Sequence, residues 1–194
     1  MIGVFHLSLQ LTQCIEPVVF YSVAVCEAVR SNMAEYWFFR EGFEEKSRQH
    51  FRKMPEPAIK LEFLIGERDF VNAGNASAQI KMALKRLGVD SAILRRVAIA
   101  AYEAEINETA HAKGGDIIGN IYPEYVLIRF FDKGPGIKDI EQSMIPGFST
   151  ADEQVREMGF GAGLGLPNIK KNVDALHIDS EAEGRTLVEI IIYF

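Results

Sequence analysis

A glycine-rich run near the end of the chain, Gly159-Phe-Gly-Ala-Gly-Leu-Gly-Leu-Pro167, has the residue types and spacing to bind phosphate. Glycine lacks a side chain and takes positive φ angles freely, so this backbone can approach a ligand closely. The run leads into a segment that is typical of a helix start, where exposed amides and the helix dipole favour an anion. A glycine-rich run can also be only a mobile loop, so the prediction depends on two further motifs.

The first of these motifs is a pair of polar residues, Glu103 and Asn107, in a segment that is predicted to be a helix over residues 90–111. Asp90 or Ser91 can cap its start, and alanines and apolar residues recur at helical spacing. Residues four positions apart share one helix face. That face can hold a carboxylate for proton abstraction and an amide oxygen for Mg²⁺, although an ordinary solvated polar face is the alternative.

The second motif follows residues 125–131, which are rich in β-branched and aromatic side chains and are predicted to form a buried strand. Asp132 comes directly after this strand, and Gly134 and Gly136 follow it. A carboxylate at the end of a strand, followed by two glycines, allows the chain to turn sharply under a ligand. An ordinary turn between strand and loop is the alternative.

In this order, Glu-x-x-x-Asn, Asp-x-Gly-x-Gly and Gly-x-Gly-x-Gly-Leu resemble the Bergerat-type ATP-binding fold of gyrase, the ninety-kilodalton heat-shock chaperone, MutL and histidine kinases. The runs Pro146-Gly-Phe-Ser-Thr150 and Gly163-Leu-Gly-Leu-Pro-Asn-Ile-Lys170 look more like the anti-sigma-factor serine/threonine kinases of bacterial stress and sporulation switches. The resemblance covers residues 58–194 and implies ATP and Mg²⁺ as ligands.

The resemblance also implies a role for individual residues. Glu103 would be the general base that activates a protein serine or a water, and Asn107 would ligate Mg²⁺ on the phosphates. Asp132 would accept the adenine amino hydrogen. The other implied nucleotide-binding residues are Gly134 and Gly136 at the adenine, Gly161, Gly163, Gly165 and Leu166 around the phosphates, and Thr186, which would support Asp132 directly or through water. Thr186 can also be only a strand residue.

Two features near these motifs carry their own expectations. Glu105 lies between the two key helix positions and should point away from their face, so we expect a surface charge. The acidic insertion at residues 151–158 is expected to be a mobile flap within a lid over the phosphates, and not a second site.

The remaining patterns predict the elements that position the motifs. Apolar alternation and β-branched residues predict strands at residues 59–65, 116–121, 125–131, 177–181 and 186–193. Helices are predicted at residues 70–87, 90–111, 137–144 and 167–176, with Gly88 as a C-terminal cap. Helices on one face of a mostly antiparallel sheet give an α+β fold, a two-layer α/β sandwich, with ATP between the lid and the helices.

Composition is consistent with this assignment. The 194 residues are 48% hydrophobic, which is enough for one well-packed domain and an extension. The net charge of −6 and the pI of about 5.3 argue against a general nucleic-acid binder. They do not argue against a protein partner.

The first 57 residues are predicted to be an N-terminal extension, followed by an ATP-binding kinase-like domain at residues 58–194. No basic segment precedes the apolar start, and the apolar run at residues 17–26 is too short to span a bilayer. Cys14 and Cys26 lack a Cys-x-x-Cys pattern, so we expect free thiols in a reducing cytoplasm. Residues 40–53 are charged and are either a linker or a short helix.

Three interpretations of this extension compete: an added helical hairpin, a partner-docking arm, or a start codon placed too early. Met54 immediately precedes the recognisable domain, so we favour Met54 as an alternative start. A native peptide from upstream of Met54, found by mass spectrometry of the source cell, would contradict this hypothesis.

Two functions from different classes are compatible with the motifs. The resemblance implies a serine/threonine kinase that phosphorylates a regulatory protein, namely a STAS-type antagonist of an anti-sigma factor. The alternative is a non-catalytic, ATP-gated module that binds a sigma factor or another regulator. Glu103 favours the kinase, because a base is needed for chemistry and not for binding. A detached histidine kinase domain is a weaker third possibility. The resemblance also suggests a homodimer, while the charge, the short apolar run and the cysteines predict a cytoplasmic protein without direct nucleic-acid or membrane binding.

Overall fold

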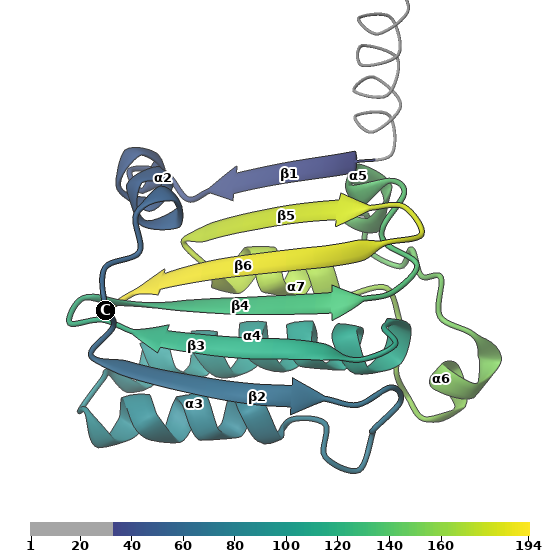
Figure 1. Cartoon of the computed structure of the whole chain (residues 1–194), viewed down its shortest axis with the longest axis horizontal. Helices are drawn as coiled ribbons and strands as arrows, with labels where there is room; N and C mark the ends of the chain where they lie inside the picture. Colours follow the sequence, from purple (N-terminus) through teal and green to yellow (C-terminus); the bar gives the residue numbers. More distant parts are fainter. Residues whose placement is uncertain (1–32) are drawn as a thin grey trace, which may run out of the picture. The chain divides into compact units, whose positions relative to one another are not determined.

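Six strands form one antiparallel sheet in the computed structural model, which describes residues 33–194 (Figure 1). Their order across the sheet is β1-β5-β6-β4-β3-β2. The strands are β1 (Met33–Phe39), β2 (Ile59–Ile65), β3 (Gly115–Ile121), β4 (Tyr125–Lys133), β5 (Ala175–Glu181) and β6 (Arg185–Tyr193). The described residues do not include Cys14, Cys26 or the apolar run at residues 17–26, so the predictions about them stay predictions.

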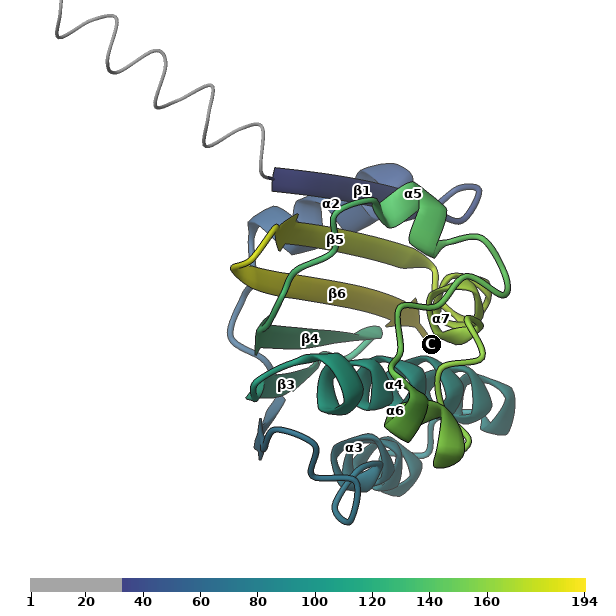
Figure 2. The same ribbon diagram turned by 90° about the vertical axis from the view of Figure 1, so that its right-hand side faces the viewer.

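Three helices cover one face of this sheet, as Figures 1 and 2 show from two directions: α3 (Asn75–Arg86), α4 (Ser91–His111) and α7 (Gly165–Asn172). The other helices, α2 (Glu44–Arg52), α5 (Ile140–Ser143) and α6 (Glu153–Glu157), lie in the connections. This arrangement confirms the predicted α+β architecture, with an antiparallel sheet and a layer of helices.

The main core lies between the sheet and the three helices, and the alternation of strand residues explains it. In β4, Val126, Ile128 and Phe130 point into this core, because every second side chain of a strand lies on the same face. The residues between them face the other side, where Tyr125 and Leu127 pack against Phe51 of α2. The predicted single helical layer is therefore incomplete, since α2 covers part of the opposite face.

The strand β1 was not predicted, because the apolar N-terminal segment has no consistent period. It pairs antiparallel with β5 and forms one edge of the sheet. Trp37 of β1 stacks on His177 of β5 with ring centroids 3.7 Å apart. Residues Met33–Phe194 form one compact unit, so β1 and α2 pack with the strands that follow Ala58. The domain limit at residue 57 and the alternative start at Met54 stay predictions.

Most predicted elements agree with the structure within a few residues, and β2 matches its predicted range. The helix predicted from residue 70 begins only at Asn75, because turns precede it and Gly74 takes a φ of 92°. Gly88, with a φ of 80°, follows the cap residue Leu87 at the other end of α3. The short helix α6 was not predicted, and it lies inside the expected flap.

Candidate functional site

The long helix α4 positions the predicted carboxylate and amide on one face. Asp90 caps its start, where its side chain accepts a hydrogen bond of 2.7 Å from the amide of Ala92. Further along, the Nδ2 of Asn168 on α7 donates a hydrogen bond of 2.7 Å to Oε1 of Glu103. Glu103 and Asn107 are both half-buried and both meet α7, so the structure brings together the pair that the sequence predicted. Asn168 was missed, although it lies within the quoted motif.

The start of α7 lies directly against the side chain of Asn107. A Cβ atom at Gly165, the first residue of this helix, would lie 2.8 Å from Oδ1 of Asn107. Leu166 is partly buried and packs against the main core, which holds this end of the helix in place. The amides at the start of α7 and the Asn107 oxygen therefore adjoin, which is an arrangement suited to an anion and a cation bound together.

The segment of residues 145–164, called the lid below, is folded tightly just before α7. Gly161 and Gly163 have φ angles of 78° and 70°, which glycine adopts without strain. A Cβ at Gly163 would overlap with the carbonyl oxygen of Phe148, and one at Gly161 would overlap with Ala151. Side chains are therefore excluded at both positions by space as well as by backbone angle.

The acidic insertion within the lid is a packed element rather than an open loop. Asp152 caps α6, and Val155 of α6 is buried with Ala110 of α4. Phe160 stacks on Phe70 from the loop before α3, with centroids 5.6 Å apart. The expected flap thus has its own helix, which contacts α4 and the loop that follows β2.

Asp132 lies near the end of β4, between Gly115 of β3 and Thr186 of β6. Burial raises the pKa of Asp132 to about 6, and a hydrogen bond from the Thr186 backbone opposes that rise. A Cβ at Gly134 would lie 3.1 Å from Oδ1 of Asp132, so this glycine leaves room beside the carboxylate. The carboxylate is half-buried and can accept a hydrogen bond from a ligand.

Ser180 of β5 and Thr186 of β6 contact each other, and Ser180 also contacts the segment that follows Asp132. Their hydroxyl oxygens are 3.0 Å apart, and Ser180 Oγ also accepts a hydrogen bond of 2.8 Å from the amide of Ile137. Gly136 takes a φ of 67°, and a Cβ there would overlap with the carbonyl oxygen of Glu181. Ser180 was missed by sequence reasoning, because a serine inside a strand carries no distinguishing pattern.

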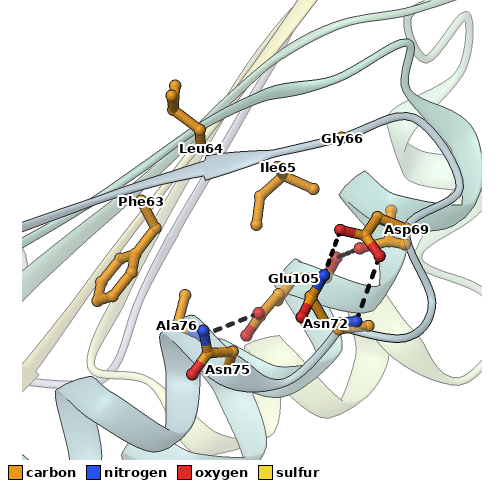
Figure 3. Close-up of a pocket in the computed structure, with 11 residues that line it drawn as sticks. Phe63, Leu64, Ile65, Gly66, Asp69, Asn72, Asn75, Ala76 and Glu105 are labelled. Atoms are coloured by element: carbon orange, nitrogen blue, oxygen red, sulfur yellow. Dashed lines mark hydrogen bonds between the residues drawn. The ribbon is translucent and has the colours of Figure 1, made fainter.

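Glu105 corrects one expectation. The sequence predicted an exposed charge, but Glu105 is 0% exposed. Its carboxylate accepts hydrogen bonds of 3.0 Å and 2.9 Å from the amides of Ala76 and Ser77 at the start of α3, and Figure 3 shows the first of them. The residue before α3, Gly74, has no side chain to cap it, so Glu105 supplies the missing acceptor and complements the helix dipole.

A small cavity of about 110 Å³ lies beside this contact. Figure 3 shows the end of β2 above it and Glu105 below, with Leu64 pointing to the other side of the strand from Phe63 and Ile65. Ligand pockets usually measure about 300–1,000 Å³, so this cavity is too small for a nucleotide. It therefore does not compete with the Glu103–Asn107 face as the candidate site.

Glu108, the residue after Asn107, is a further buried acid that the sequence did not single out. Burial and then the neighbouring acids Asp132, Asp116 and Glu105 raise the pKa of Glu108 to about 8. Within residues 33–194 there is no group of three or more histidine, cysteine or acidic side chains that could hold a metal ion by itself. None of the helices described there is long and apolar enough to cross a membrane.

Fold and site together define the class: a small α+β protein whose acid–amide pair adjoins a helix that starts at a glycine-rich segment. The chain is 31% identical over 111 residues to the serine/threonine-protein kinase RsbT of Bacillus subtilis (strain 168). The match covers 55% of this chain and 77% of RsbT. A scan against models of known protein families finds no match. The chain belongs to the family of anti-sigma-factor serine/threonine kinases.

Proposed function

We propose that this protein is an ATP-dependent serine/threonine kinase with a Bergerat-type ATP-binding fold. Its substrate is a STAS-type antagonist in a bacterial partner-switching pathway, and it acts in the cytoplasm. The observation that supports this proposal best is the arrangement of Glu103 and Asn107 against the start of α7. The similarity to RsbT, which is named as a kinase of this type, supports it independently.

The nucleotide base belongs at Asp132 in this proposal. The carboxylate accepts a hydrogen from the adenine amino group, and Gly134 leaves space beside it. Gly136 and Thr186 hold the turn that closes this end of the pocket.

The phosphates belong at the other end of the same site, along the start of α7. The residues proposed to surround them are Gly161, Gly163, Gly165 and Leu166, whose backbone amides suit an anion at a helix start. Asn107 fits a role as Mg²⁺ ligand, since its amide adjoins Gly165. Bound Mg²⁺ would neutralise part of the phosphate charge.

Glu103 is the proposed general base. It takes the proton of the substrate serine or threonine hydroxyl while the new oxygen–phosphorus bond forms and the bond to ADP breaks. Asn168 donates a hydrogen bond to Oε1 of Glu103 and so fixes the orientation of the carboxylate. The packing of α6 on α4 allows the lid to exclude water from the transfer.

The alternative, a non-catalytic ATP-gated binding module, also has one observation in its favour. Arg68, from the loop after β2, pairs with Asp152 and donates a hydrogen bond to Gln154 in the lid. Nucleotide that moves the lid would therefore change a surface outside the site. A homodimer, which the family resemblance suggests, stays a prediction for either function.

Phosphotransfer from γ-labelled ATP is the direct test. Purified full-length protein is incubated with Mg²⁺ and an extract of the source organism, beside the Glu103→Gln variant. We expect one small labelled protein with the wild type and a rate about 10²–10⁴-fold lower with the variant, which should still bind ATP. The Asp132→Asn variant should lose ATP binding, because its amide no longer presents a charged acceptor to the base.

The possible outcomes separate the two functions. A variant at Glu103 that transfers phosphate at the wild-type rate would remove Glu103 from the role of base. ATP binding without any labelled protein would favour the gated module, and capture of its partner would follow. A wild-type protein that binds no ATP would refute both.

A further inference from the structure

Glu108 is a buried acid without hydrogen-bond partners. It follows Asn107 on α4, is 4% exposed, and has two carboxyl oxygens that are both buried and both unpaired. Leaving a buried acceptor unpaired costs free energy, and native structures contain few such groups. Glu105, one turn earlier on the same helix, has two backbone amides as donors. Burial alone therefore does not explain the unpaired carboxyl of Glu108.

The carboxyl of Glu108 lies against the strands that carry Asp132. A Cβ at Gly115 of β3 would overlap with Oε1 of Glu108 and would lie 3.0 Å from the Cα of Asp132. Gly115 and Asp132 are also direct neighbours in the sheet. Glu108 thus lies between Asn107 at the phosphate end of the proposed site and Asp132 at its base end.

The groups that act on this carboxyl offer it no compensating positive charge. They are Asp132 on β4, Asp116 on β3 and Glu105 on α4 itself, and all three are acids. A carboxyl in such surroundings gains most from a ligand that brings N–H donors. The adenine amino group has two N–H bonds, and the proposed contact with Asp132 uses one of them.

We propose that Glu108 is a second base-binding residue, which accepts the other amino hydrogen of adenine and so selects a 6-aminopurine. This inference rests on the proposed ATP site. In either protonation state the carboxyl keeps an oxygen that can accept a hydrogen bond. Guanine carries a carbonyl oxygen at the same ring position, and that oxygen would face the ionised carboxylate of Asp132, which has no hydrogen to donate to it.

Binding of modified nucleotides tests the proposal through a coupling between ligand and side chain. Affinities of the full-length protein for ATP, N6-methyl-ATP and GTP are measured by calorimetry with Mg²⁺, for the wild type, Glu108→Val and Glu108→Gln. We expect the wild type to bind ATP about tenfold or more tightly than N6-methyl-ATP, because a hydrogen bond to a buried acceptor is lost. In Glu108→Val that preference should shrink to about twofold, while Glu108→Gln, which keeps an acceptor, retains it.

Thr109→Val is the matched control on the same helix. Its hydroxyl bonds to the backbone of Glu105, and its substitution should leave base preference unchanged. An unchanged preference for ATP over N6-methyl-ATP in Glu108→Val would overturn the inference while the kinase proposal stands. Equal wild-type affinity for ATP and GTP would do the same. Absence of ATP binding in the wild type would overturn the inference together with the proposed site.

Discussion

Two buried acids, Glu108 and Asp174, lie toward opposite ends of the sheet and differ in what surrounds them. Glu108 lies against Gly115, which pairs with Asp132 near the end of β4, whereas Asp174 precedes β5, is 2% exposed and contacts the end of β6. The Asp174 carboxylate is paired with Arg40 at 2.9 Å and Arg96 at 2.5 Å, and it accepts a hydrogen bond of 2.9 Å from the Tyr193 amide.

Glu108 and Asp174 differ in the partners of their carboxyl groups and not in how deeply they are buried. Asp174 is compensated by Arg40, directly after β1, and by Arg96 of α4, and it also accepts the amide hydrogen of Tyr193 in β6. Glu108 is buried to a similar extent but has no hydrogen-bond partner and has acids around it. An acid that is fully paired within the chain serves the fold, whereas one left unpaired needs another explanation, and for Glu108 we propose a ligand. Each prediction below tests one side of this difference.

The largest expected effect is at the paired acid. Asp174→Ala removes the common partner of the partly exposed Arg40 and Arg96 and leaves the buried Tyr193 amide without its acceptor, so we expect the free energy of unfolding to fall by about 2–3 kcal/mol. Urea unfolding followed by the fluorescence of Trp37, the single tryptophan, measures this loss. ATP affinity should stay unchanged under conditions where the variant is folded.

The exposed pair of Lys60 and Glu62 on the edge strand β2 gives a control for that prediction. Both side chains are more than half exposed, so Glu62→Ala should change stability by less than about 1 kcal/mol. If Asp174→Ala lowers stability as little as Glu62→Ala does, the buried pairing of Asp174 does not stabilise this end of the sheet.

The second prediction is a gain in stability, in contrast to the loss expected for Asp174→Ala. Glu108→Val removes two unpaired buried oxygens and places a hydrophobic side chain among the residues between α4 and the sheet. In the absence of nucleotide we expect stability to rise by about 1–2 kcal/mol, measured by the same urea unfolding at neutral pH. A loss of stability would show that the carboxyl is compensated within the chain, and the comparison with Asp174 would fail.

The sequence alone was enough to predict which residues lie on the same face of one helix or strand. Glu103 and Asn107 share a face because they are four apart on a helix, and β4 alternates between two faces because it is a strand. The sequence was not sufficient where two helices meet. α4 contacts both α7 and α3, so a residue that points away from the candidate site, such as Glu105, is buried on the other side.

The same limit applies to contacts made across the sheet. β1 gains its strand conformation from pairing with β5, which is more than a hundred residues away in sequence, and no local period reveals it. The hydrogen bond from Asn168 to Glu103 and the unpaired state of Glu108 likewise depend on packing between distant segments. Motifs therefore identified the candidate site, while the acids that surround it required the structure.

The smallest effect concerns Asp132, whose burial raises its pKa to about 6. The charged carboxylate is the stronger acceptor for the adenine amino group, so ATP affinity should fall as the pH drops through that pKa. Since protonation removes the charged acceptor, we expect a loss of about tenfold per pH unit below about pH 6.

Inorganic triphosphate controls for the titration of the phosphates in this experiment, because it binds the same end of the site and has no base. The difference between the two pH profiles isolates the base contact. If ATP and triphosphate lose affinity in parallel, Asp132 does not bind the base. The unpaired acid beside it would then need another explanation than a nucleotide, because Glu108 and Asp132 adjoin the same backbone of β3.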